Sequence, residues 1–342
     1  MSISLFETRT LLAAVEQIKS PRMFLKEMFF KTVETFTSEH VDIDIVKGKR
    51  TVAPIVNPIK EGKVVQSQGY TSRSVKPGYV KPKIVTTAGD LMFRAAGETV
   101  YGTSTPEQRA AAKLGKDLAY LDEMITRREA VMVSQVLQTG KVNMYGDGIY
   151  EQVDFGMDAT HLPTLVNTAV WANALATPLA NLRTWCGLIQ KDAGLVPDVA
   201  VFGATAWDQF LSNVADVQKM LNLLKVNIGQ IDPQLLPDGV TYMGRIIELG
   251  LDIYTYTDWY LDDQNSNTET AMVGASNVII GSTRAQCSMG YGAIKDLKAM
   301  YAMPRFAKSW EEEDPSVRYL MTQSAPLPLF KQPDAFVCAT VN

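Results

Sequence analysis

The sequence predicts an α+β fold in two lobes that are organised around one long helix. Three observations support this fold class. A continuous helical pattern spans residues 105–139, a basic segment broken by prolines spans residues 54–83, and helices alternate with strands between residues 166 and 299. A chain of 342 residues with 46% hydrophobic side chains is long enough to bury a core in each lobe.

Residues 1–45 are expected to form an N-terminal arm that ends in a first strand. The arm contains two amphipathic pieces, TRTLLAAVEQIK and PRMFLKEMFFKTV, which are separated by Ser20 and Pro21. The second piece carries large apolar side chains whose exposure would be costly, so it must pack either on its own domain or on a neighbouring molecule. The following HVDIDIV alternates polar and apolar residues, as a half-buried strand does.

Residues 46–90 are expected to form an extended loop, a basic β-hairpin that reaches out from the domain. Four prolines and three glycines interrupt residues 54–83, which is typical of edge strands and projecting hairpins. The segment from Lys47 to Lys83 carries a charge of +8, so the rest of a chain with net charge −4 carries −12. Such a strip is either a solvated face or a surface that meets an acidic partner, which would be nucleic acid or another copy of the chain.

The long helix is expected over residues 105–139 and has capping signals at both ends. Thr105 fits the N-cap, Pro106 the first helical position and Gln108 the third position of a capping box. Gly140 supplies the stop. About 34 residues with a rise of ~1.5 Å each give a rod on the order of 50 Å long, across which a sheet and a neighbouring subunit can lie. One face is apolar, and its members are Leu114, Leu118, Leu121, Ile125, Met132 and Val136.

The middle of the chain is expected to form a hairpin and then a compact α/β lobe. Gly146 and Gly148 mark a hairpin turn within residues 141–165. The elements predicted for the lobe are a helix over residues 177–194, a buried strand over 198–203, a second helix over 204–226 and β-rich structure over 239–280.

The last part of the chain is expected to return to a position beside the long helix. Residues 300–330 fit a long hairpin around four consecutive acids, and DAFVCATV fits a last strand. Early and late segments would then share one sheet. If the basic strip lies on another copy, the four acids are its candidate partners. The candidate contacts between copies are Arg73, Lys76, Tyr79, Lys81, Lys83, Glu311, Glu312, Glu313 and Asp314.

The residue inventory does not predict an enzyme. The patterns G-x-x-x-x-G-K-[ST] and G-x-S-x-G are absent, and three cysteines and two histidines are too scattered to suggest a metal centre or a catalytic dyad. No catalytic, cofactor-binding or metal-binding residue is therefore expected. No apolar run is long enough for a membrane span and the N-terminus lacks a secretory signal, so the protein is expected in a cytoplasm-like compartment without membrane contact.

Five features occur in a fixed order along the chain: PRMFLKEMFF, IVNPIKEGKVVQSQG, PGYVKPK, the long capped helix and TQSAPLPLF. In this order, and over nearly the whole chain, the sequence resembles the major capsid proteins of tailed phages, the family of the phage lambda major head protein. These are motifs that specify shape rather than a catalytic signature.

The resemblance implies an HK97-like major capsid fold. Its parts would be an N-terminal arm (1–45), an extended loop (46–90), a peripheral domain with the spine helix (91–165), an axial domain (166–299) and a return to the peripheral domain (300–342). It also implies two packings of similar free energy, with a hinge between residues 89 and 102 where the loop joins the helix.

The resemblance further implies a structural subunit that self-assembles, as pentamers and hexamers, into the icosahedral head shell around double-stranded DNA in the host bacterial cytoplasm. The expected partners are a scaffolding protein, a portal protein and in many members a decoration protein, and a procapsid would expand during maturation. The alternative is a bacterial nanocompartment (encapsulin-like) shell protein, which shares the fold and packages cargo protein instead of DNA.

Overall fold

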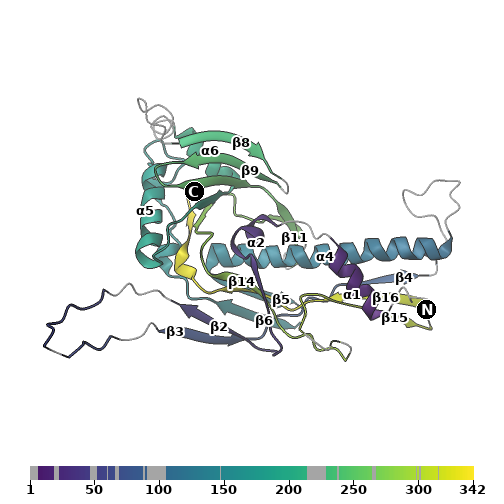
Figure 1. Cartoon of the computed structure of the whole chain (residues 1–342). Coiled ribbons are helices and arrows are strands. Elements are labelled where there is room, and N and C mark those ends of the chain that lie inside the picture. Colours follow the sequence, from purple (N-terminus) through teal and green to yellow (C-terminus); the bar gives the residue numbers. More distant parts are fainter. Residues whose placement is uncertain are drawn as a thin grey trace.

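The computed structural model describes residues 7–18, 23–46, 52–59, 61–65, 69–87, 89–90, 105–146, 148–213, 229–236, 239–263, 267–297, 299, 302–314 and 316–342. The long helix α4 (Pro106–Thr139) runs through the molecule, a loop projects at one end and a helix-supported hairpin lies at the other (Figure 1). Of the expected hinge between residues 89 and 102, only residues 89–90 lie within the described part.

Helix α4 has the caps that the sequence predicts. The backbone N–H of Gln108 donates to the Thr105 hydroxyl at 3.3 Å, and the N–H of Thr105 donates to the Gln108 side chain at 3.1 Å. Gly140 ends the helix with a φ of 68°, a left-handed conformation that glycine adopts without steric cost. The predicted bounds of this helix are confirmed at both ends.

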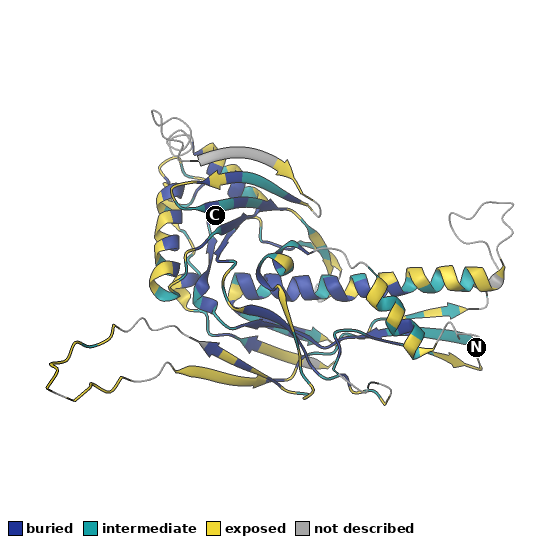
Figure 2. Ribbon diagram, viewed as in Figure 1, coloured by how far each residue is buried: buried dark blue, intermediate teal, exposed yellow. Residues whose placement is uncertain are grey.

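The C-terminal half of α4 is buried in the core, whereas its N-terminal half has one exposed face (Figure 2). The expected apolar stripe is confirmed: Leu114 is half-buried, and the buried members are Leu118, Leu121, Ile125, Met132 and Val136.

A six-stranded sheet separates two hydrophobic cores. Val201 and Ile279 point into the core that contains α4, while their neighbours Ala200 and Ile280 point into the core covered by α5 (Pro178–Asp192) and α6 (Ala204–Ser212). Strands that are buried on both faces need continuous apolar runs, as these have. The strand order is β18 (Phe336–Thr340), β13 (Asn277–Gly281), β7 (Val199–Phe202), β10 (Leu251–Tyr256), β9 (Val240–Ile246) and β8 (Gly229–Leu235).

The elements predicted for this lobe are largely confirmed. Helix α5, strand β7 and the β-rich region occur where the sequence predicts them, and the last includes a small hairpin of β11 (Trp259–Asp262) and β12 (Thr268–Ala271). Helix α6 starts at Ala204 as expected and ends at Ser212, and residues 214–226 of the predicted helix lie outside the described residues.

The position of the last strand differs from the prediction. Strand β18 packs against α4, but it pairs with β13 in the six-stranded sheet and not in a sheet with an early segment of the chain. Phe336 and Cys338 enter one core, whereas Val337 and Ala339 enter the other. A strand that is apolar on both faces must lie between two cores to bury both of them. Strand β18 therefore forms one edge of the six-stranded sheet and does not join the hairpin within residues 300–330.

Three strands and the short helix α2 (Phe24–Phe29) pack against the core that contains α4. β1 (Thr32–Thr35) runs parallel to β14 (Cys287–Tyr291), which pairs in turn with β17 (Pro326–Phe330).

The predicted hairpin after α4 is confirmed as β5 (Lys141–Gly146) and β6 (Ile149–Asp154). The 3-10 turns are η1 (Ala159–His161), η2 (Asn167–Ala169) and η3 (Pro333–Ala335).

The N-terminal segment (the described residues 7–18 and 23–35) packs on its own chain. Leu11 of α1 (Thr8–Gln17) is buried with Leu118 of α4, and Phe29 of α2 (Phe24–Phe29) is buried in the core that contains α4. Of the two packings that the sequence allows, the structure therefore has the one on the same chain for these residues.

The distal hairpin, β15 (Phe306–Glu312) and β16 (Val317–Gln323), lies beneath the N-terminal half of α4. Strand β4 (Lys83–Thr87) pairs with β16, so an early and a late segment share one sheet beside the helix, as predicted.

The basic hairpin has different strands from those expected. Its paired strands are β2 (Val41–Val46) and β3 (Tyr70–Val75), and no strand occurs in the described residues 52–59 and 61–65. The reason is burial, because Val41 and Ile43 alternate into the core and hold β2 there. The expected second half of the hairpin belongs to another sheet, as β4.

Candidate assembly surfaces

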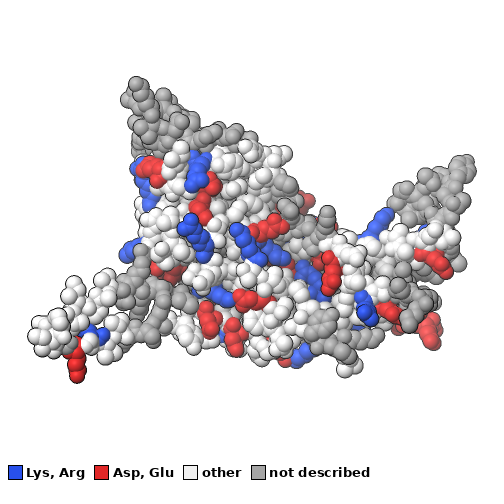
Figure 3. Space-filling view, in the orientation of Figure 1, with Lys and Arg blue, Asp and Glu red and all other residues white. Residues whose placement is uncertain are grey.

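The projecting loop (the described residues 52–59 and 61–65) connects β2 to β3 and leaves the body at one end (Figure 1). Most of its surface carries no charged side chain (Figure 3). Its most exposed apolar side chains, each at least 91% accessible, are Val52, Ile55, Ile59 and Val64. Soluble monomers rarely expose so many large apolar side chains on one element, so this loop is a candidate contact surface.

Two of the predicted contact residues hold the base of the β2–β3 hairpin on its own chain. Arg73 donates a hydrogen bond to the backbone carbonyl of Asp154. Lys76 forms an ion pair with Glu39, which also pairs with Lys295. Hydrogen bonds from Lys295 and Lys76 lower the pKa of the Glu39 carboxyl to about 2.

Three further predicted residues follow the hairpin and also contact their own chain. The Tyr79 hydroxyl donates to the carbonyl of Ala293 at 2.8 Å. The Lys81 ammonium lies 4.7 Å from the centre of the Tyr79 ring, and that of Lys83 lies 5.2 Å from the centre of the Tyr319 ring, which are cation–π contacts. The members of the basic strip outside the described residues are Lys47, Lys49, Arg50 and Lys60.

The predicted acids form an exposed acidic tip (residues 311–314) at the turn of the distal hairpin. Glu311 forms an ion pair with Arg318, and the Tyr319 hydroxyl hydrogen-bonds to Glu312. Among the residues that the structure describes, Glu313 and Asp314 have no ion pair. Part of the negative charge at the tip is therefore not neutralised within the described chain.

A groove of about 480 Å³ lies between the acidic tip and the N-terminal half of α4. Its apolar lining includes Leu114, Val317 and Leu320. Its charged lining consists of the cations Lys113 and Arg318 and of four acids, which are Asp117 and three acids of the tip, so it carries a net negative charge. Burial raises the pKa of the Asp117 carboxyl, and the nearby negative charge of Asp90 raises it further. The groove therefore suits an apolar segment that carries positive charge.

The structure does not gather the predicted contact residues into one site. Arg73 and the projecting loop lie at one end of the molecule and the acidic tip lies at the other, whereas Lys83 lies in the same sheet as the tip (Figure 1). The projecting loop and the acidic tip of one subunit therefore do not contact each other.

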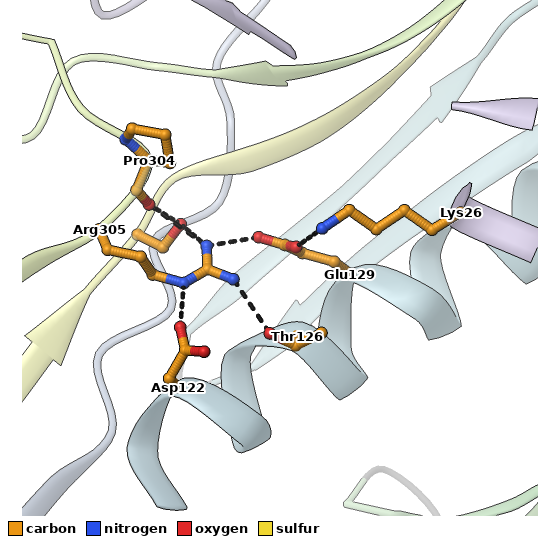
Figure 4. Close-up of polar contacts among 7 residues, drawn as sticks. Lys26, Asp122, Thr126, Glu129, Pro304 and Arg305 are labelled. Carbon is orange, nitrogen blue, oxygen red and sulfur yellow. Dashed lines mark hydrogen bonds and ion pairs between the residues drawn. The ribbon is translucent and has the colours of Figure 1, made fainter. Parts of the chain in front are cut away.

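A buried charge network (Lys26, Asp122, Glu129 and Arg305) joins α2, α4 and the start of the distal hairpin (Figure 4). Arg305 donates to Glu129 at 2.6 Å and to Asp122 at 2.8 Å. Lys26 donates to the second oxygen of Glu129 at 2.6 Å. Arg305 also donates to the Thr126 hydroxyl at 3.3 Å. The side chain of Glu129 is fully buried, and that of Asp122 is 4% exposed.

The charges of this network are balanced, with two cations and two carboxylates. Burial alone would raise the pKa of Glu129, but the attraction of Arg305 and Lys26 and their hydrogen bonds outweigh it, so the pKa is lowered. Tyr291 of β14 hydrogen-bonds to Glu129, and its ring centre lies 5.8 Å from the Arg305 guanidinium. Burial raises the pKa of the Tyr291 hydroxyl, which keeps it neutral beside the carboxylate.

Sequence reasoning missed this network, although a signal for it exists. Asp122 follows Leu118 by four residues and Glu129 follows Ile125 by four, so both acids lie on the apolar stripe of α4. An acid on a buried helical face requires a buried cation, but helical periodicity alone does not say which one.

His161, Cys186 and Cys338 are of residue types that often take part in catalysis, but all three are buried. His161 is buried, and its ring nitrogens lie 2.7 Å from the Phe336 carbonyl and 3.2 Å from Asp192. Burial raises the pKa of the Cys186 and Cys338 thiols to about 12, so these thiols stay protonated. Within the described ranges, no group of three or more His, Cys, Asp or Glu residues is placed to hold a metal. None of the helices in the described part is long and apolar enough to span a membrane.

The fold is that of a phage capsid subunit. The structure matches the crystal structure of a prophage capsid protein from Escherichia coli CFT073 with a TM-score of 0.75 at 19% identity, and the match covers 100% of both chains. The two-lobed arrangement around a long helix is therefore the HK97-like architecture that the sequence predicts.

Residues 7–341 match the family described as phage major capsid protein E, and the chain belongs to this family. It is 29% identical to the major capsid protein of Enterobacteria phage P21 over 99% of this chain and 100% of that protein. It is also 26% identical to the major capsid protein of Escherichia phage lambda over 98% of each chain. The family is structural, so the chain is a capsid protein and not an enzyme. The family match also favours a phage capsid over a nanocompartment shell.

Proposed function

We propose that this chain is the subunit that forms the icosahedral head shell of a tailed phage around double-stranded DNA. The observation that carries this proposal is the match to the phage major capsid protein family over residues 7–341. The subunit geometry supports it, because each copy has an exposed apolar loop at one end and a groove at the other. In a closed shell every loop and every groove has a partner.

The proposed contact places the projecting loop of one copy in the groove of its neighbour. The apolar lining, with Leu114 and Leu320, suits the exposed Ile59 and Val64 of the loop, and the net negative charge of the groove suits Lys63. Exposed ion pairs contribute only about 0.2–1 kcal/mol each, but they recur in every copy of a shell and they set the register of the contact.

We further propose the family division of the chain, with one change. The parts are an N-terminal arm (1–45), an extended loop (46–90), a peripheral domain with α4 (91–165), an axial domain (166–299) and a return segment (300–342). Strand β18 of the return segment is assigned to the axial domain, because its ladder partner is β13.

The proposed partners are other copies of the chain in pentamers and hexamers, a scaffolding protein, a portal protein, a decoration protein and non-specifically bound DNA. Assembly would take place in the host bacterial cytoplasm and would be followed by expansion of the procapsid. The P21 and lambda relatives, which are named as major capsid proteins, support assembly with other copies of the chain. A nanocompartment shell remains the competing function, and it would enclose a cargo protein instead.

The test is co-expression with the scaffolding protein, followed by sedimentation and negative-stain microscopy. The wild-type chain should form closed shells, and shells filled in the host should protect DNA from nuclease. Val64→Asp should leave the circular dichroism spectrum and the melting temperature of the subunit unchanged but should lower the shell yield at least about tenfold, because a charge replaces an apolar contact.

The matched control is Asn57→Asp, which adds the same charge to the same loop without removing an apolar group. It should assemble normally. Normal shells from Val64→Asp would remove the loop from the contact. Shells that enclose a specific protein and no DNA would favour the nanocompartment function.

A further inference from the structure

Arg305 clamps the base of the distal hairpin to α4. It precedes β15 by one residue, and its guanidinium donates to the hydroxyl of Ser324, which follows β16 by one residue, at 3.2 Å. The same guanidinium binds Glu129 and Asp122 on α4. Both strands of the hairpin are therefore joined to the helix through this one side chain.

Helix α2 reaches the same clamp from the N-terminal segment. Lys26 binds the Glu129 oxygen that Arg305 leaves free, so the two cations share one carboxylate. Helix α2 is also held by contacts outside the network, because Phe29 is buried against Phe336 with ring centroids 5.1 Å apart. The docking of α2 can therefore be weakened without changing any member of the charge network.

The strength of the clamp depends on burial. The side chain of Glu129 is 0% exposed, that of Arg305 12% and that of Lys26 21%. Ion pairs that are open to water contribute little, whereas buried and hydrogen-bonded pairs interact strongly because water does not screen them. If α2 left α4, water would reach Glu129 and one of its two cations would be lost.

We propose that docking of α2 tightens the base of the distal hairpin through Glu129, so that release of α2 from α4 loosens the hairpin that carries the acidic tip. The groups that face Glu129 are Lys26 from α2, Arg305 from the hairpin base, Tyr291 from β14 and Asp122 on its own helix. The meaning of this coupling for shell assembly rests on the proposed function, but the coupling itself is a property of the single subunit.

The first test measures amide hydrogen exchange of the monomeric subunit at one pH. Phe29→Ala removes an anchor of α2 and leaves the charge network unchanged in composition. Exchange of the β15 and β16 amides should rise at least about tenfold, which corresponds to about 1.4 kcal/mol of local opening. The matched control is Leu182→Ala, in the core on the other side of the six-stranded sheet, which should leave exchange in the hairpin unchanged.

The second test changes the charge alone and does not depend on Phe29→Ala being foldable. Lys26→Met keeps most of the aliphatic stem and should also raise hairpin exchange, whereas Lys26→Arg should stay near the wild type. In a Glu129→Gln background, Lys26→Met should have no further effect on the hairpin.

Faster exchange in α2 with an unchanged hairpin would overturn the coupling, and so would equal effects of Lys26→Met with and without Glu129→Gln. These measurements need no shells, so their failure would leave the proposed function untouched. A failure to form shells would in turn leave the coupling untouched.

Discussion

Leu118→Ala tests whether the apolar stripe of α4 holds the distal hairpin. Leu118 is 1% exposed and lies in a small cluster where α1, α4 and the hairpin meet. Its buried neighbours are Leu11, Leu121, Ala307 and Leu320. The substitution removes three buried carbon atoms from a site that three separate elements share.

The expected cost is about 2–4 kcal/mol. Replacing a buried leucine by alanine costs about 2–5 kcal/mol, and the larger values belong to sites that cannot collapse around the cavity. The cluster contains only five buried side chains and is bordered by half-buried ones such as Leu114 and Ile84, so it can relax in part. The lower part of the range is therefore expected.

The assay is urea unfolding of the monomeric subunit, followed by circular dichroism. Lys116→Ala lies on the exposed face of the same helix and should change the free energy of unfolding by less than about 0.5 kcal/mol. Leu118→Ala should also reduce shell yield, because the acidic tip and the groove depend on the hairpin. Equal stability of the two variants would refute the assigned face of the helix.

Acid should weaken the base of the β2–β3 hairpin, because Glu39 has a folded pKa of about 2, below its usual 4.5. Stability from this carboxylate is present above about pH 4.5 and is lost as the pH falls towards 2, so the wild type should lose stability more steeply in that window than Glu39→Gln does. Identical pH profiles would show that the ion pairs of Glu39 contribute nothing in solution. Gly203→Ala should give insoluble protein, because a Cβ there would lie 2.3 Å from the backbone oxygen of Gly274. In thermal melts Gly187→Ala should be at least as stable as the wild type, since its added methyl group meets open space within a helix. A soluble Gly203→Ala protein with an unchanged melting temperature would contradict the close approach of these two segments.

Sequence patterns predict those elements whose signals are local. The capping box of Thr105 and Gln108 and the stop at Gly140 define α4 because the groups that satisfy the helix ends lie within four residues of them. The β5–β6 hairpin around Gly148 and the helix after Pro178 follow from the same kind of short-range chemistry. These elements have the predicted type and nearly the predicted bounds.

The candidate contacts between copies stay a prediction. Charge along the chain identifies the basic strip and the acidic tip, and the resemblance identifies the class of protein. The sequence does not reveal that Arg73 and Lys76 are engaged by Asp154 and Glu39 of the same chain. An unpaired lysine and a paired lysine look alike in a sequence, because the partner is chosen by the fold.

The sequence by itself therefore determined the long helix, most of the strands and the capsid class of the protein. Only the tertiary structure decided that β4 pairs with β16, that β18 pairs with β13 and that Lys26 and Arg305 share Glu129. The physical reason is that an apolar strand or a buried acid specifies that it must be covered, but not by which distant segment. That choice depends on how all the buried faces of the chain pack together at once.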